Sequence, residues 1–173
     1  MEQKKLAIIA TKGSLDWAYP PFILASTAAA LGYETQIFFT FYGLQLLKKK
    51  LHLEVTPLGN PGMPMPMGMD KWFPVLGMAL PGMQAMMTSM MKAKMKSKGV
   101  ASIDELRELC IEAEVKLIAC QMTVDLFDMD SSEFISGVEY AGAAAFFEFA
   151  GESDRSEERR VGKECRSRWP QYP

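Results

Sequence analysis

The stretch Lys-Leu-Ile-Ala-Cys-Gln-Met, residues 116–122, decides the fold of this chain. Its apolar residues are consecutive, which is the pattern of a short strand covered on both faces, as in the parallel sheets of α/β proteins. Cys120 stands where this apolar run meets polar residues. Because open α/β sheets hold their ligands beyond the carboxyl ends of the strands, Cys120 is the first candidate for a functional residue. From its position alone, a structural role for Cys120 stays open as the alternative.

Elements of both kinds alternate along the rest of the chain. A second run of consecutive apolar residues at 6–11 predicts another buried strand. Pro20 and Pro21 suit the first turn of a helix, and Gly32 suits its end. The alternation predicts an α/β fold with a doubly wound parallel sheet in three layers, α/β/α. The predicted elements are strands at 6–11, 33–40, 51–57 and 115–122, helices at 18–31, 41–50, 102–113, 133–140 and 143–150, and a loop or first helical turn at 123–129.

Residues 59–99 form a methionine-rich insertion, which is too long for an ordinary connection and so is expected to be functional or interfacial. Eleven of the fourteen methionines lie between 63 and 95. Residues 72–91 carry no charge and are long enough to cross a bilayer, but Pro74 and Pro81 interrupt them. We interpret the segment as a broken helix that packs against the core, a second subunit or a membrane surface. The lysines that follow it would suit peripheral membrane contact through residues 72–98.

Composition excludes several classes of function. Hydrophobic residues make up 49% of the 173, charged residues 23%, and the net charge is -2, as in an ordinary globular protein with no affinity for nucleic acid. No signal peptide is visible, and the three cysteines have no repeated spacing, so we expect a protein of the reducing cytoplasm without disulfides. His52 is the single histidine and follows a lysine-rich helix end, which argues against Ser-His-Asp catalysis. Residues 12–16 hold one glycine, so no phosphate loop is predicted there. No cofactor-binding or metal-binding residues are predicted elsewhere.

Cys110 lies on the predicted helix that precedes the Cys120 strand. Ser102 and Glu105 have the spacing of a capping box at the start of that helix, and Cys110 shares its apolar face with Ile103 and Leu106. Two readings stay open from spacing alone. Cys110 is either a small buried core residue or a resolving partner for Cys120.

The last residues depart from the pattern of the rest. Residues 155–169 are densely charged without helical or strand periodicity, and they closely resemble the translation of a sequencing-adaptor oligonucleotide. We therefore expect one domain over 1–154 and a non-native tail over 155–173. Cys165 would then have no function, and the last strand of the doubly wound sheet would be missing.

Three parts of the chain together resemble the DsrE/DsrF-like family, in its subgroup with a long methionine-rich insertion. The first is Lys-Leu-Ala-Ile-Ile-Ala-Thr-Lys-Gly at 5–13, and the second is the methionine-rich insertion itself. The third and most specific is the block from Cys110 to Asp125, Cys-Ile-Glu-Ala-Glu-Val-Lys-Leu-Ile-Ala-Cys-Gln-Met-Thr-Val-Asp. The resemblance covers about residues 4–154.

The resemblance implies a flavodoxin-like, oligomeric sulfur carrier with sulfurtransferase-like chemistry. Cys120 matches the position that accepts sulfur as a persulfide from a donor and passes it to a thiol of a partner protein, and Cys110 matches the second cysteine of the subgroup. A thiol between a strand end and the next helical segment can have its pKa lowered by backbone N–H groups, here those of residues 121–123. Asp125 either caps a helix or orders this loop.

A second hypothesis assigns the function to the methionines. Thioethers with a thiolate suit Cu(I), so the chain could be a metal-handling or membrane-associated interaction protein without catalysis. The opposing interpretation is that methionine fills irregular apolar interfaces. A third reading, a nucleotide- or flavin-binding domain, has only fold analogy behind it. The methionines that would share one helical face are Met83, Met86, Met87, Met90 and Met91.

Overall fold

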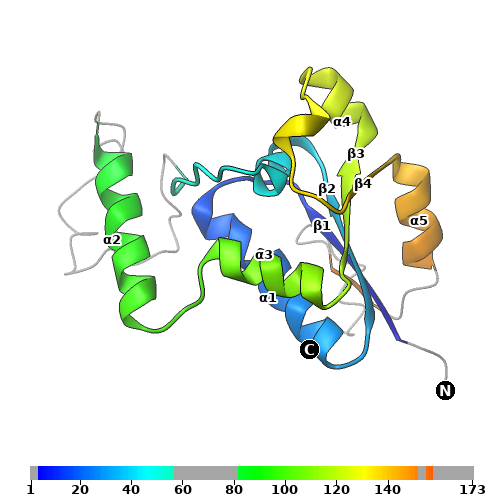
Figure 1. The fold of residues 1–173 in the computed structure, drawn as a ribbon, viewed down its shortest axis with the longest axis horizontal. Coiled ribbons are helices and arrows are strands. Elements are labelled where there is room, and N and C mark those ends of the chain that lie inside the picture. Colours follow the sequence, from blue (N-terminus) through cyan, green and yellow to red (C-terminus); the bar gives the residue numbers. More distant parts are fainter. Residues whose placement is uncertain (1–3, 57–81, 152–154, 158–173) are drawn as a thin grey trace, which may run out of the picture.

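The computed structural model describes residues 4–56, 82–151 and 155–157. Its centre is a sheet of five parallel strands in the spatial order β4-β3-β2-β1-β5 (Figure 1). The first four strands follow one another across the sheet, and β5 returns to the far side of β1. The strands are β1 (Lys5–Ala10), β2 (Glu34–Phe39), β3 (Lys116–Cys120), β4 (Val138–Ala141) and β5 (Arg155–Glu157).

Helices cover both faces of the sheet, which confirms the three-layer α/β fold. The helices α1 (Leu15–Ala30) and α3 (Ile103–Glu112) pack together on one face, and α5 (Ala143–Gly151) lies on the other (Figure 1). The short helix α4 (Gln121–Leu126) stands at the carboxyl edge of the sheet, directly after β3 (Figure 1).

The core divides into two clusters, one on each face of the sheet. Alternate residues of β3 point to opposite faces, so Leu117 and Ala119 pack with α1 and α3, whereas Ile118 and Cys120 pack toward α5. This alternation separates the two cysteines, because Cys110 belongs to the cluster under α1 and α3.

The capping box that the sequence predicts is present at the start of α3. The Ser102 hydroxyl accepts the Glu105 backbone N–H at 3.2 Å, and Glu105 Oε2 accepts the Ser102 N–H at 2.6 Å. Both donors would otherwise lack a partner in the helix. The box therefore fixes where α3 begins and, with it, the approach to β3.

Three predicted elements near the amino end are corrected. Helix α1 begins at Leu15, so Pro20 and Pro21 lie inside it and not in its first turn. The predicted helix at 41–50 is a shorter 3-10 helix, η1 (Phe41–Leu47), and Lys48 follows it in extended conformation to pair with Glu133 at 2.8 Å. No strand forms at 51–56, where the backbone instead supports α1 through a hydrogen bond from Leu15 N–H to the Glu54 carbonyl at 2.8 Å.

The predicted helix at 133–140 is wrong. The chain there forms a single 3-10 turn, η4 (Ser131–Glu133), capped by Asp130, and then strand β4. Gly137 has a φ of 84°, which breaks the helical path. The open edge of β3 then supplies the backbone partners that turn the next four residues into a strand.

The expectation of a missing last strand is also wrong. Arg155–Glu157 pairs in parallel with β1, opposite Leu6, Ala7 and Ile8. A strand at this edge needs only backbone donors and acceptors, so a segment without strand-like periodicity can supply it.

The methionine-rich insertion is described only in its second half, as α2 (Met83–Ser97), and residues 59–81 of it lie outside the described residues. Two hydrogen bonds attach α2 to the loop before the insertion. Gln84 Nε2 donates to the Val55 carbonyl at 3.0 Å, and Val55 N–H donates to the Thr88 hydroxyl at 3.1 Å. Over the described ranges, no helix is long and apolar enough to cross a membrane.

Candidate functional site

The site forms where β2 and β3 end side by side. The two strands pair in parallel, with Phe39 opposite Ala119. The residues that follow them, Thr40 and Cys120, therefore lie at the same edge of the sheet. Cys120 is the last residue of β3 and also the N-cap of α4, as the sequence predicts for a thiol at a strand end.

Two threonine hydroxyls form a small network beside the thiol. The Oγ1 atoms of Thr40 and Thr123 lie 3.1 Å apart, so either hydroxyl can donate to the other while the thiol is protonated, and both can turn to the sulfur once it is ionised. Thr123 is fully buried, and its Oγ1 also accepts the Phe41 N–H at 3.4 Å. Phe41 has a φ of 48°, an uncommon conformation for a residue with a bulky side chain, and it is in this conformation that its N–H meets Thr123.

The surroundings of Cys120 favour its thiolate. Burial alone would raise the pKa of the thiol, but hydrogen bonds from the hydroxyl and N–H of Thr123, from the Thr40 hydroxyl and from the Met122 N–H stabilise the anion. The net effect is a pKa below the ordinary value of 9.0. The residue is 4% exposed, so the site combines an activated thiol with restricted access.

Cys110 has the opposite environment. It is fully buried between α3 and α1, its Sγ donates to the Phe22 carbonyl at 3.5 Å, and burial raises its pKa to about 11. Because it packs on the other face of the sheet from Cys120, the structure does not bring the two predicted site cysteines together.

Asp125 does not cap a helix. It lies inside α4, one turn after Gln121, and its Oδ1 accepts a hydrogen bond from Gln121 Nε2 at 2.7 Å. The pair crosses one exposed turn of the helix that begins at the thiol, so Asp125 orders this segment from its outer surface. Cys165, the third cysteine, lies outside the described residues.

The neighbouring strand β4 ends in two small residues. Ala141 lies opposite Cys120 in the sheet, and Gly142 follows it. A Cβ atom placed on Gly142 would meet no atom within 4 Å.

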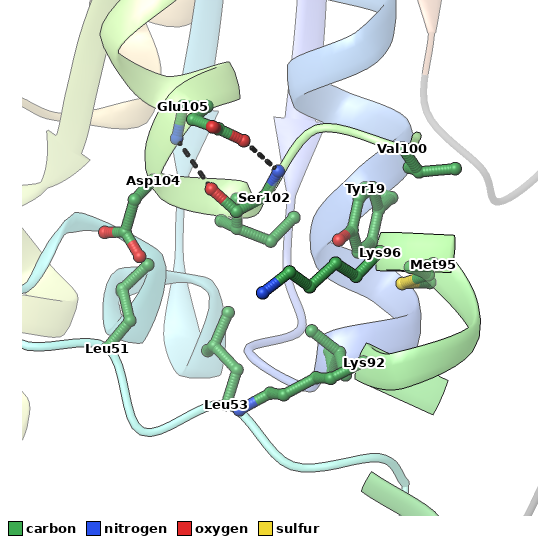
Figure 2. Close-up of a pocket in the computed structure, with 12 residues that line it drawn as sticks. Tyr19, Leu51, Leu53, Lys92, Met95, Lys96, Val100, Ser102, Asp104 and Glu105 are labelled. Atoms are coloured by element: carbon green, nitrogen blue, oxygen red, sulfur yellow. Dashed lines mark hydrogen bonds between the residues drawn. The ribbon is translucent and has the colours of Figure 1, made fainter. Parts of the chain in front are cut away.

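A separate cavity of about 420 Å³ lies between α1, α2, α3 and the loop at 51–53 (Figure 2). Lys92 and Lys96 extend into it from α2, and Tyr19 of α1 lines it as well (Figure 2). Among the described residues that line it there is neither cysteine nor Thr123, so it is not part of the thiol site. Within the same described ranges, no group of three or more His, Cys, Asp or Glu side chains could hold a metal ion.

The model of the DsrE/DsrF/DrsH-like family matches residues 2–156. The chain belongs to this family. Among its relatives is the "Sulfur carrier protein DsrE2" of Allochromatium vinosum, which is 90% identical over 154 residues, covering 89% of this chain and 97% of that protein. The "Uncharacterized protein YrkE" of Bacillus subtilis is 34% identical over 157 residues, covering 87% of this chain and 94% of that protein.

Among solved structures, the ychN protein from E. coli has a similar fold, with a TM-score of 0.50 at 11% sequence identity. The similarity covers 89% of this chain and 97% of that one. It agrees with the α/β fold of the DsrE/DsrF/DrsH-like family member described above, and it carries no information on chemistry at this level of identity.

Sequence reasoning found the thiol of this family member but missed its two hydroxyl partners. Thr40 could have been found, because it directly follows the second buried strand and parallel strands end at one edge. Thr123 lies three residues after Cys120, at the spacing at which a side chain returns to the start of a helical turn. The Thr40 signal depends on knowing that β2 and β3 are neighbours, whereas the Thr123 signal is local to the turn that follows Cys120.

Proposed function

We propose that this protein is a sulfur carrier that holds sulfur as a persulfide on Cys120 and passes it to a thiol of a partner protein. The observation that carries the proposal is the position of Cys120 at the carboxyl end of β3 and at the N-cap of α4, beside the paired Thr40 and Thr123 hydroxyls. Hydrogen-bond donors at this position lower the pKa of the thiol. The relative named as a sulfur carrier, 90% identical over 154 residues, supports the same function.

The proposed chemistry is two exchanges at sulfur, with no net oxidation. In loading, the Cys120 thiolate attacks the outer sulfur of a donor persulfide, and the donor leaves as a thiol once it has taken the persulfide proton. In transfer, an acceptor thiolate attacks the outer sulfur now on Cys120. The S–S bond breaks, and Cys120 leaves as the thiolate that the threonine hydroxyls stabilise.

Cys110 has a structural role in this proposal. A thiol whose pKa is raised to about 11 is protonated near neutral pH and is a poor nucleophile. Its complete burial on the other face of the sheet keeps it from Cys120 and from any partner. We therefore assign sulfur transfer to Cys120 alone, in a protein of the reducing cytoplasm.

We further propose that the protein is a homo-oligomer, that residues 1–154 form a single native domain, and that residues 72–98 contact a membrane surface. Helix α2, which belongs to residues 72–98, supports the membrane contact. Its Met86 and Met90 side chains are exposed, and lysines follow them in the last turn of the helix. The same helix does not favour a copper site built from methionines on one face. Met91 packs on the core, whereas Met86 and Met90 are exposed to solvent.

The test is to load the reduced protein with a persulfide donor and to weigh it, in a Cys165→Ser background that removes the tail thiol. We expect a gain of one sulfur. The gain should vanish in Cys120→Ser and persist in Cys110→Ala. A gain that survives in Cys120→Ser would place the carrier elsewhere, and no gain in the parent protein would reject the function.

A further inference from the structure

An exposed apolar surface surrounds the thiol site. We call it the aromatic patch, and each of its five side chains is at least 42% exposed. Two of them, Tyr42 and Phe127, stack with their ring centroids 6.0 Å apart and so join η1 to the end of α4. The patch consists of Phe41, Tyr42, Met122, Leu126 and Phe127.

The patch is continuous with the catalytic thiol. Phe41 donates its N–H to Thr123, the residue whose hydroxyl stabilises the Cys120 thiolate. Met122 is two residues from Cys120, and its backbone N–H contributes to the lowered pKa of the thiol. A molecule that rests on the patch would therefore lie against the turn that holds the reacting sulfur.

The segment that forms the α4 side of the patch is acidic. Asp125 and Asp128 are exposed within α4 and directly after it, and Asp130 follows. Between Lys116 and Arg155 the sequence has no Lys, Arg or His. On the η1 side, Lys48 pairs with Glu133 at 2.8 Å, Lys12 lies 3.6 Å from the centre of the Trp17 ring, and Lys49 and Lys50 are exposed.

We propose that the aromatic patch docks the acceptor protein through a segment in which the reactive cysteine is flanked by apolar side chains and by Lys or Arg. The proposal rests on the proposed function and names the chemistry of its partner. Exposed aromatic and methionine side chains beside a site are typical of protein contact surfaces. The aspartates would steer a basic segment to the thiol.

A second copy of this chain docked by the same patch fits less well. A twofold contact would place the patch on itself and so bring Asp125 and Asp128 close to their own copies. Like charges that meet across an interface are unfavourable. Asp125 and Asp128 therefore favour a partner of opposite charge.

The docking can be tested without any persulfide. The probes are two short peptides, Arg-Leu-Cys-Leu-Arg and Glu-Leu-Cys-Leu-Glu, each with its cysteine as a mixed disulfide with thionitrobenzoate. The Cys120 thiolate attacks the peptide sulfur, a disulfide forms between protein and peptide, and the coloured thionitrobenzoate anion leaves. The protein is the full chain with Cys165→Ser, and Cys120→Ser is the blank.

We expect the basic peptide to react about tenfold faster than the acidic one at low salt, with the advantage shrinking as salt is added. Each rate is divided by the rate of the same peptide with mercaptoethanol, which removes differences in the peptides' own reactivity. The double variant Asp125→Asn and Asp128→Asn should lose most of the preference. Glu112→Gln, an exposed acid on α3, is the matched control and should keep it.

The apolar part of the patch has its own variant. The double variant Tyr42→Ser and Phe127→Ser should react more slowly with both peptides, by about the same factor. Its reaction with the mixed disulfide of mercaptoethanol and thionitrobenzoate should keep the rate of the parent protein. Equal normalised rates for the two peptides in the parent protein, or a preference that Asp125→Asn and Asp128→Asn leave intact, would overturn the proposal. Concentration-dependent dimerisation lost in the Tyr42 and Phe127 variant would assign the patch to a second copy. Failure of persulfide loading would reject the carrier function alone, because this assay does not use it.

Discussion

The reactivity of Cys120 depends on a balance between burial and hydrogen bonding. Burial disfavours the thiolate, and the Thr123 and Thr40 hydroxyls with two backbone N–H groups more than offset it. Position in the sequence was enough to single out Cys120, because a polar break after an apolar run marks a strand end. It was not enough for Thr40, which lies eighty residues earlier and reaches the thiol only through the pairing of β2 with β3.

Replacing Thr123 by valine tests this balance. Thr123→Val keeps the shape of the side chain but removes a hydrogen bond to the thiolate, so the pKa of Cys120 should rise. Alkylation by iodoacetamide, followed by mass across a pH series, should show the inflection move to higher pH. Thr35→Val is the control, because Thr35 is equally buried on β2 but donates to the Tyr33 carbonyl at the other end of the strand. An inflection that stays in place in Thr123→Val would remove the hydroxyl from the account.

At the scale of elements, α3 and β3 were predictable and β4 was not. The capping box and the apolar spacing of α3 are local signals, and the structure has both. Strand β4 is only four residues long and half exposed, so its own pattern is weak. It forms because β3 offers a free edge, which is information that no window of the sequence contains.

The contact between α3 and α1 should make stability depend on pH through Cys110. Because burial raises the pKa of Cys110 from 9.0 to about 11, its contribution is fully present below the unfolded pKa and is lost as pH rises toward the folded one. Cys110→Ala should cost about 1 kcal/mol near neutral pH. At alkaline pH the parent should lose up to about 2–3 kcal/mol of its free energy of unfolding through ionisation of Cys110, and Cys110→Ala should not show this loss.

Urea unfolding at several pH values measures this difference. Cys120→Ser is the opposed control: the folded pKa of Cys120 is lowered, so the stability it contributes is present above its unfolded pKa and is lost as pH falls through the folded value. The two variants should therefore diverge from the parent in opposite directions above neutral pH. A parallel pH dependence in all three proteins would contradict the assigned environments.

For the whole molecule, the order β4-β3-β2-β1-β5 places the thiol away from the sheet edge where the tail pairs. Cys120 lies between the ends of β2 and β4, whereas Arg155–Glu157 pairs with β1. The sequence predicted the layers and the parallel sheet from the alternation of elements. It could not predict β5, because edge pairing uses backbone groups and leaves little trace in side-chain pattern.

A chain that ends at Asp154 should therefore keep its fold and its site. Removing β5 deletes a few backbone hydrogen bonds, so we expect a loss of about 1–3 kcal/mol in the free energy of unfolding. The amount of sulfur loaded per chain should not change. A chain that ends at Glu157 is the control and should match the full-length protein in stability. Loss of loading in the Asp154 form would show that the tail supports the site.

The central claim is that sulfur travels on Cys120, and the most direct measurement locates the added atom. The loaded protein is alkylated, digested and analysed by mass for each cysteine-containing peptide. The account predicts one extra sulfur on the peptide that contains Cys120 and none on that of Cys110, with the Cys120 signal lost when a small thiol is added. Extra sulfur on the Cys110 peptide, or none on the Cys120 peptide of a folded protein, would contradict it.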